Sequence, residues 1–192
     1  IIVKSFYPKN ELHLFILAIA AILLFEAIPV YADSTSTQKP TGVTNFDQIK
    51  YLIGEWVGEG GGDPGQGTGG FSFNLDLQGK IIVRKNYAEY PATKDKPAYK
   101  HDDFMVLYQE NTSSPLKAIY WDNEGHVINY VVEISSDQKS IIFISDISAS
   151  APRFRLTYTR TDDENVRINF EMASPNKPEE FSKYIEASAH RK

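Results

Sequence analysis

The feature that most constrains the fold is a regular series of short strand-like runs separated by turn signals. Ten runs rich in Val, Ile, Phe and Tyr follow residue 54, and clusters of Gly, Asn, Asp, Ser or Pro lie between nearly all of them. The runs are 55–60, 71–77, 80–90, 102–109, 116–121, 126–135, 140–145, 153–160, 166–172 and 183–190. With no long helical pattern and no fixed-period repeat, the series predicts an all-β antiparallel barrel or sandwich rather than a propeller.

Two short segments carry helical signals. Asn45 is a suitable N-cap for residues 46–53, whose apolar side chains predict a short N-terminal helix packed on the strands. The second candidate helix is the connection 175–181, before the last run.

The first 32 residues have the pattern of a secretory signal peptide. Lys4 and Lys9 precede the apolar run 14–25, and small or medium residues lie before a cleavage site after Ala32. The alternative is a membrane anchor, but the apolar run is shorter than the ~20 residues that a spanning helix needs. We therefore expect no stable membrane anchor after the signal is cleaved.

The composition after residue 32 fits one exported domain. Residues 33–45 are rich in Ser and Thr and are expected to form a flexible leader, and 46–191 form the barrel domain. The chain has no Cys, so this domain must rely on its own core. The formal net charge is −5 without a Lys/Arg cluster, which argues against nucleic-acid binding. The pattern suits a secreted or periplasmic bacterial protein.

The glycine-rich stretch between Gly54 and Gly70 raises the question of a nucleotide site. It contains two overlapping G-x-G-x-x-G spacings, at Gly60/Gly62/Gly65 and Gly65/Gly67/Gly70. A dinucleotide site needs a helix after the loop, whereas the next segment, FSFNLDL, alternates as a strand. No GK[ST] follows either, so we interpret the stretch as a long flexible hairpin loop.

The start of this stretch reads G-x-W-x-G-x-G, with Trp56 placed to close one end of a barrel. A short helix followed by G-x-W resembles the calycin superfamily, and the nitrobindin-like barrels and small bacterial barrels of unknown function within it. The resemblance covers residues 46–191. It implies an antiparallel up-and-down barrel of about ten strands, of lipocalin or nitrobindin type.

Nitrobindins bind haem through a histidine in the last strand, and here Tyr184 stands at that position. His190 lies six residues further on, roughly 20 Å along a strand. Tyrosine ligates haem iron in some proteins. We expect no cofactor, and Tyr184 is the candidate ligand only if haem is bound.

Polar residues on the barrel-facing side of strands are the candidate ligand contacts. His126 shares a strand face with Ile128, Tyr130, Val132 and Ile134, so that face is expected to be interior. The first alternative is that His126 caps the Asp122–Gly125 turn, and the second is that it contacts a ligand.

Arginines form the other polar set. Arg84 shares a face with Asn86, and Arg153 shares one with Arg155. An inward Arg needs a partner, and Asp103 and Glu171 are available. Two inward arginines would make an anion site, whereas outward arginines would be solvated strand residues.

The sequence gives no catalytic set. His101-Asp102-Asp103 does not have the spacing of zinc ligands, and the sequence contains no G-x-S-x-G nucleophile elbow with which it could form a catalytic triad. The sequence thus favours a binding protein over an enzyme.

We therefore expect a secreted barrel that binds a small apolar or amphipathic molecule in its interior. The ring surface would come from Trp56, Tyr120, Tyr130 and Tyr184, and the polar contacts from Arg84, Asn86, His126 and Arg155. Two alternatives stay open, a haem protein that handles nitric oxide or peroxynitrite and a filled barrel that acts as an interaction module.

Overall fold

The structure is a computed structural model that describes residues 45–59 and 67–192. The expected signal peptide, the leader up to residue 44 and the centre of the glycine-rich loop (60–66) lie outside the described residues. Within the described part of the chain, no helix has the length and apolar character needed to cross a membrane.

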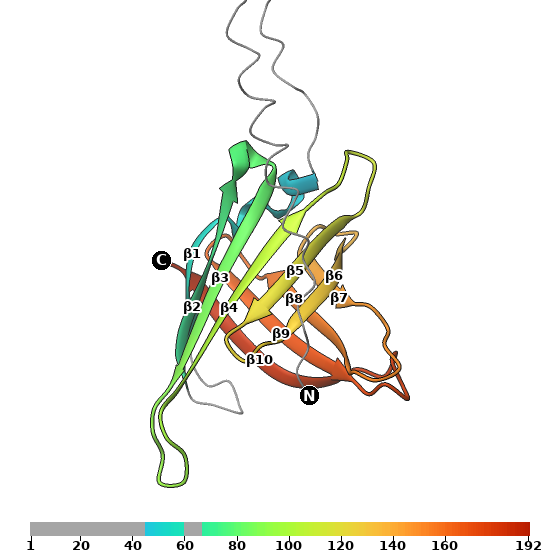
Figure 1. The fold of residues 1–192 in the computed structure, drawn as a ribbon. Coiled ribbons are helices and arrows are strands. Elements are labelled where there is room, and N and C mark those ends of the chain that lie inside the picture. The colour runs from blue at the N-terminus through green and yellow to red at the C-terminus, as the bar shows by residue number, and fades with distance from the viewer. Residues whose placement is uncertain (1–44, 60–66) are drawn as a thin grey trace, which may run out of the picture. The chain divides into compact units, whose positions relative to one another are not determined.

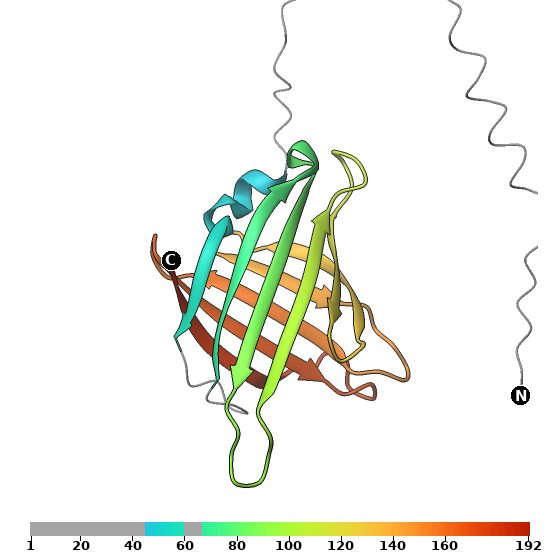
Figure 2. The ribbon, with the colours of Figure 1, turned by 60° about the vertical axis from the view of Figure 1, so that its left-hand side comes forward.

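Ten antiparallel strands form a closed barrel in which each strand pairs with its neighbours along the chain and β10 returns to β1 (Figures 1 and 2). This confirms the all-β barrel and excludes the sandwich. Two 3₁₀ segments accompany the strands, η1 (Asn45–Leu52) and η2 (Leu77–Gly79). The strands are β1 (Gly54–Glu59), β2 (Thr68–Asp76), β3 (Ile81–Tyr90), β4 (Tyr99–Tyr108), β5 (Leu116–Asp122), β6 (Val127–Ile134), β7 (Ser140–Ser145), β8 (Arg153–Arg160), β9 (Asn165–Ala173) and β10 (Ser182–Arg191).

One end of the barrel, here called the helix end, is covered by η1 (Figure 2). Phe46, Ile49 and Leu52 bury their side chains in the barrel core. Trp56, only 3% exposed, donates a hydrogen bond from its indole Nε1 to the Leu52 carbonyl at 2.9 Å. The opposite end, the far end, holds the turn 123–126 and the β3–β4 connection 91–98 (Figure 1).

The seam between the first and last strands is tied to η1. Trp56 is paired in register with Arg191, whose guanidinium lies 4.6 Å from the centre of the indole ring. Arg191 also donates to the carbonyls of Ile53 and Tyr51 at 2.9 and 2.8 Å. One side chain therefore links the seam, the ring beneath it and the helix.

The core is filled with rings at the helix end and in the middle. Phe71 and Phe73 pack edge-on against Tyr158, at centroid distances of 5.3 and 5.5 Å, and Phe143 lies 6.2 Å from the same ring. Nearer the far end, Phe154 and Phe170 stack at 5.8 Å and are only partly buried. The barrel therefore becomes less tightly enclosed toward its far end.

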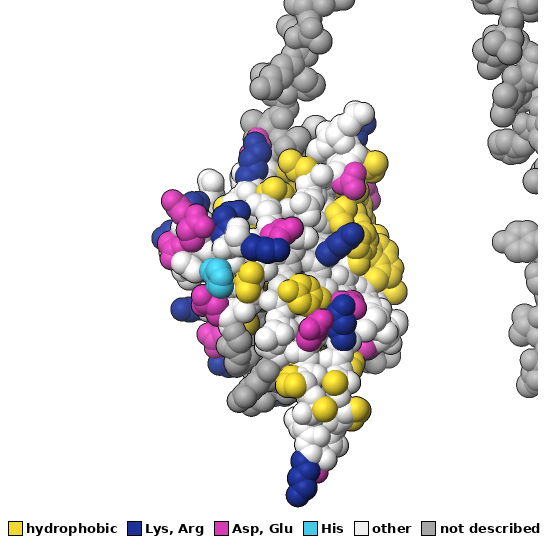
Figure 3. Space-filling model, turned by 90° about the vertical axis from the view of Figure 1, so that its left-hand side faces the viewer, with side chains coloured by type: hydrophobic (Ala, Val, Ile, Leu, Met, Phe, Trp, Pro, Cys, Tyr) yellow, Lys and Arg dark blue, Asp and Glu magenta, His cyan; other side chains and the backbone are white. Residues whose placement is uncertain are grey.

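The strand predictions agree with the structure to within a few residues, but the second candidate helix is wrong. Residues 175–181 form isolated turns, closed by the hydrogen bonds Lys177 N to Ser174 O and Glu180 N to Lys177 O, both 3.0 Å. Pro178 has no N–H to continue a helical ladder. The outer surface has mixed charge where Figure 3 shows it, with acidic and basic side chains interspersed around apolar ones.

Candidate functional site

One wall of the barrel carries a continuous set of inward polar side chains, here called the polar wall. It lies on three neighbouring strands, because alternate residues of β3, β4 and β5 point to the interior. The register places Asn86 opposite Asp103, and Asp103 opposite Asp122. The polar wall consists of Arg84, Asn86, His101, Asp103, Tyr120 and Asp122.

A buried ion pair forms the inner end of the polar wall. Arg84 and Asp103 are 5% and 8% exposed, and Arg84 Nη1 donates to Asp103 Oδ1. Asn86 Nδ2 donates to the other carboxylate oxygen at 2.7 Å. Burial opposes both charges, but the Asp103 carboxylate raises the pKa of Arg84, and Arg84 with His101 holds the pKa of Asp103 below its ordinary value. The pair is therefore charged on both sides.

His101 connects this inner pair to the far end. Its Nε2 lies 3.4 Å from Asp103 Oδ2 and 3.3 Å from the Tyr120 hydroxyl, and its Nδ1 lies 2.8 Å from Glu124 Oε1. The hydrogen bond to Asp103 raises the pKa of His101, burial opposes this, and the hydrogen bond to Glu124 raises it further, to about 9. The imidazole is therefore a cation shared between two carboxylates at neutral pH.

Asp122 organises the far end of the polar wall. It accepts a hydrogen bond from the Tyr120 hydroxyl at 3.1 Å, and its other oxygen accepts from the backbone N–H groups of Glu124 and His126 at 3.0 and 2.9 Å. The exposed His126 side chain lies 2.8 Å from the same carboxylate, outside β6. His126 therefore contacts the turn, as the first alternative has it, from an exposed position.

Two buried polar atoms beside the polar wall have no hydrogen-bond partner among the described residues. They are Arg84 Nε and the hydroxyl of Tyr158, a residue that is 0% exposed. The two groups are close, because the Arg84 guanidinium carbon lies 5.7 Å from the centre of the Tyr158 ring. Burial, only partly offset by Arg84, raises the pKa of Tyr158 to about 12, so the hydroxyl is neutral. Arg84 lowers the pKa of Tyr158 by its charge and by a side-chain contact with the hydroxyl, but the geometry of that contact leaves Arg84 Nε and the Tyr158 hydroxyl without a normal hydrogen bond.

Two predicted aromatic residues adjoin this region. Trp56 stacks on Phe71 at 5.9 Å with an interplanar angle of 11°, and the Phe71 ring in turn lies 6.0 Å from the Arg84 guanidinium. Tyr130 is buried and packs edge-on against Phe143 at 6.1 Å. With Arg84, Asn86 and Tyr120, these residues belong to the barrel interior.

Arg155 lies elsewhere. It pairs with Glu171 through two hydrogen bonds of 2.6 and 2.7 Å and stacks on Phe181 at 4.2 Å. Its neighbours along β8, Phe154 and Leu156, take the inward positions. The second inward arginine that an anion site would need is therefore absent from this face.

Tyr184 lies at a bulge in β10, where the register to β9 shifts between Lys183 and Ile185. Its ring is 50% exposed and meets the edge of Phe170 at 6.1 Å. A half-exposed ring against Phe170 does not fit an iron ligand enclosed by a barrel. His190, further along β10, pairs with Glu59 of β1 at 3.0 Å. The described residues also contain no group of three or more His, Asp or Glu arranged for a metal ion.

Sequence reasoning missed His101, Asp122, Glu124 and Tyr158 as site residues. His101 shares strand parity with Asp103, and this signal could have found it, because Asp103 was already expected to pair with an inward Arg. Glu124 belongs to a turn, where side chains do not alternate between two faces as they do in a strand, so its position could not be predicted from alternation. Its contact with His101 depends on how the β5–β6 turn folds over β4.

The His101 bridge predicts a stability change in mild alkali. The folded-state pKa of about 9 exceeds the ordinary value of 6.5, so the stabilisation is fully present below pH 6.5 and is lost as the pH rises through 9. We expect the free energy of unfolding in urea to fall between pH 6.5 and 9.5 in the wild type. The His101→Gln variant should lack this fall, and an equal fall in both proteins would contradict the assignment.

The polar wall is a charge-balanced network with the buried Arg84–Asp103 pair at its inner end, and two buried polar atoms without a hydrogen-bond partner lie beside it. It presents hydrogen-bond donors and acceptors to the barrel interior, with the Tyr120 hydroxyl between His101 and Asp122. These features carry the functional inference, because no protein-family model and no curated protein matches the chain.

Proposed function

We propose that the protein binds a small, partly apolar ligand inside the barrel, with the polar end of the ligand at Arg84 and Tyr158. The observation that carries this proposal is the pair of unpartnered buried atoms, Arg84 Nε and the Tyr158 hydroxyl. Burying such groups without a partner costs about 1–3 kcal/mol each, and a ligand oxygen would supply the missing hydrogen bonds. Small-molecule sites share this design of an apolar lining with few placed polar groups.

The charges of the polar wall favour a neutral polar end. Arg84 is neutralised by Asp103, and His101 is shared between Asp103 and Glu124. A ligand carboxylate would be repelled by the carboxylates of Asp103 and Glu124, and both cations are already paired with them. A hydroxyl or carbonyl oxygen fits better, because it accepts from Arg84 Nε without adding charge.

The apolar part of the ligand would lie toward the far end. Phe154 and Phe170 present partly buried stacked rings there, and Ile128 and Ile168 are also only partly buried. Burial of apolar ligand surface against such side chains gives about 25 cal/mol per Å². The far end is therefore the side from which we expect the ligand to approach.

We also propose that the barrel is of calycin type and that the protein is exported. The calycin assignment is supported by G-x-W at the start of β1, directly after η1, and by a ten-stranded meander closed on itself. Export to the periplasm or medium is supported by the charged and apolar segments before Ala32. No observation favours the haem alternative over a ligand held by Arg84 and Tyr158.

Native mass spectrometry tests the proposal directly. The full chain is expressed and the protein purified without denaturation, and we expect an added mass of a small lipid-like or alcohol-like molecule. A haem-sized mass would contradict the proposal. Repeated preparations with the bare protein mass, and no binding of long-chain alcohols in titrations, would contradict it too and favour a filled barrel acting as an interaction module.

Removing the Tyr158 hydroxyl should separate binding from stability. We expect Tyr158→Phe to raise the free energy of unfolding of the ligand-free protein by about 1 kcal/mol, because it removes an unpartnered buried hydroxyl. The same change should weaken ligand retention in native mass spectra. Tyr120→Phe is the control, and it should lower stability because Tyr120 donates to Asp122. A marked loss of stability in Tyr158→Phe would show that its hydroxyl has a protein partner.

A further inference from the structure

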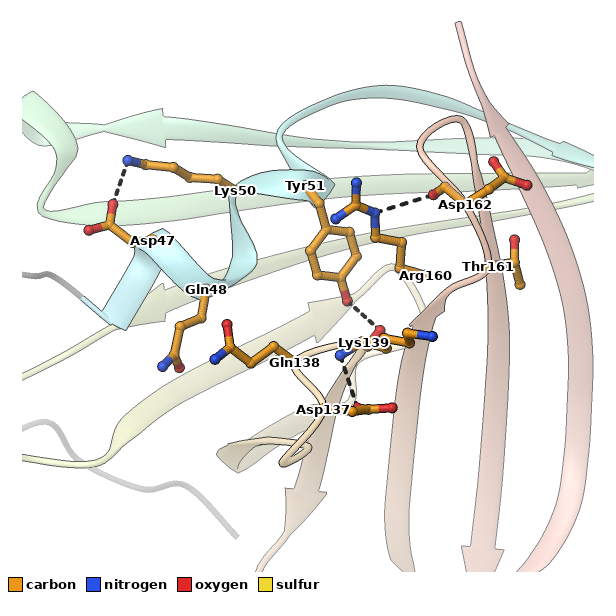
Figure 4. A pocket seen from close by; sticks show the side chains of 10 residues that line it. All are labelled: Asp47, Gln48, Lys50, Tyr51, Asp137, Gln138, Lys139, Arg160, Thr161 and Asp162. Atoms are coloured by element: carbon orange, nitrogen blue, oxygen red, sulfur yellow. Dashed lines mark hydrogen bonds and ion pairs between the residues drawn. The ribbon is translucent and has the colours of Figure 1, made fainter.

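A polar groove lies outside the barrel at the helix end, between η1 and the β6–β7 and β8–β9 turns (Figure 4). Its volume is about 530 Å³, which is within the range of about 300–1,000 Å³ typical of small-molecule sites. The barrel interior is a separate space, because Trp56 and the buried face of η1 close this end. A ligand in the groove would therefore not be the ligand of the proposed barrel site.

The walls of the groove are held in place by Tyr51. Its hydroxyl donates to the carbonyls of Lys139 and Tyr158, at 3.2 and 3.4 Å, and so fixes η1 to the β6–β7 turn and to β8. Burial raises the pKa of Tyr51 to about 12, so the hydroxyl remains a donor. The Arg160 guanidinium lies 5.7 Å from the ring centre of Tyr51. The groove is thus a preformed feature of the fold.

The charged groups of the groove are balanced, and most of them are already engaged. Asp47 pairs with Lys50 at 2.5 Å, and Arg160 pairs with Asp163. Asp137 and Asp162 accept backbone N–H groups of their own turns. The lining contains three acidic and three basic side chains, Asp47, Asp137, Asp162, Lys50, Lys139 and Arg160. This balance disfavours a strongly anionic or cationic ligand.

Two neutral amides remain available. Figure 4 shows the side chains of Gln48, from η1, and Gln138, from the β6–β7 turn, extending toward each other across the groove. No hydrogen bond to another described residue involves either amide. Gln138 has a φ of +58°, a backbone conformation that glycine adopts at lower cost. The turn therefore carries a strained residue whose side chain lines the groove.

We propose that this groove binds a short neutral oligosaccharide. Each amide offers an acceptor and two N–H donors, which matches sugar hydroxyls that both donate and accept. An extended peptide would need a free strand edge, and the ten described strands close on themselves. A helical peptide would need an apolar groove, whereas this one is lined by charged and amide side chains.

An array of immobilised neutral oligosaccharides, probed with the protein purified after expression of the full chain, tests the proposal. We expect binding to at least one oligosaccharide, followed by calorimetric titration with the same compound in solution. Gln138→Gly and Gln48→Ala should each weaken binding about tenfold, through the loss of amide hydrogen bonds. Gln138→Gly relieves backbone strain, so its loss of binding would not reflect unfolding.

Gln78→Gly is the matched control, because Gln78 also has a positive φ, of 59°, and does not line the groove. It should leave oligosaccharide binding unchanged, and all three variants should retain any ligand of the barrel interior in native mass spectra. An array without a binder would overturn the proposal, and so would equal binding by wild type and both groove variants. If the wild type bound peptides and Gln138→Gly did not, the ligand of the groove would be a peptide and the oligosaccharide proposal would be overturned.

Discussion

Replacement of Arg84 by Met should lower the free energy of unfolding by about 3–5 kcal/mol, because it leaves the Asp103 carboxylate buried without its cation. Asp103 is 8% exposed, so water cannot take over the role of the guanidinium. Two neighbours, Asn86 and His101, would still contact the carboxylate but would not replace the full charge. Urea unfolding at neutral pH, followed by circular dichroism, measures the change.

Arg155→Met provides the matched control for Arg84. Arg155 also pairs with a carboxylate, Glu171, but both side chains are partly exposed on the outside of the barrel. Such pairs contribute about 0–1 kcal/mol, so this variant should lose much less stability. The double variant Arg84→Met/Asp103→Leu should recover most of the loss, since apolar pairs often replace buried ion pairs without cost. Equal losses of unfolding free energy in the two single variants would contradict the claim that burial makes the Arg84 pair more important for stability.

Trp56→Ala should cost about 3–5 kcal/mol, the range for removing a large buried aromatic side chain. The variant loses the stack on Phe71, the contact with Arg191 and the hydrogen bond to Leu52. These contacts hold the helix, the seam and the core together, so we also expect η1 to detach. Thermal unfolding gives the stability, and proteolysis near residues 45–52 reports the detachment.

Trp121 is the other tryptophan of the chain and offers a natural comparison. It is 38% exposed on the outer face, where its ring lies 6.0 Å from Phe104. Trp121→Ala should therefore cost less than half as much as Trp56→Ala and should not expose η1 to protease. A larger effect at Trp121 would show that the outer face, not the helix end, dominates stability.

The strands could be predicted because their signals are local. Alternating Val, Ile and aromatic residues between turn residues identify a strand without knowledge of its partner, and the inward face of β6 follows from Ile128, Tyr130, Val132 and Ile134. The segment 175–181 does not form the expected helix, because Pro178 lacks the N–H that a helical ladder needs there.

The candidate site could be predicted only in part. The pairing of Arg84 with Asp103 follows from the need of a buried charge for a partner. The contact between His101 and Glu124 joins a strand to a turn, and no periodicity in the sequence specifies it. The bulge at Tyr184 likewise breaks the alternation on which strand facing is predicted.

The seam between β1 and β10 has a consequence for how the protein reaches its native state. Every other strand pairing joins neighbours along the chain, whereas this one joins Trp56 to Arg191. Pairings between distant residues form slowly, so we expect closure to come late in folding. Until then both terminal strands present open edges, which are sites of aggregation. Chaperones that hold unfinished sheets would therefore be needed most just before the last strand docks.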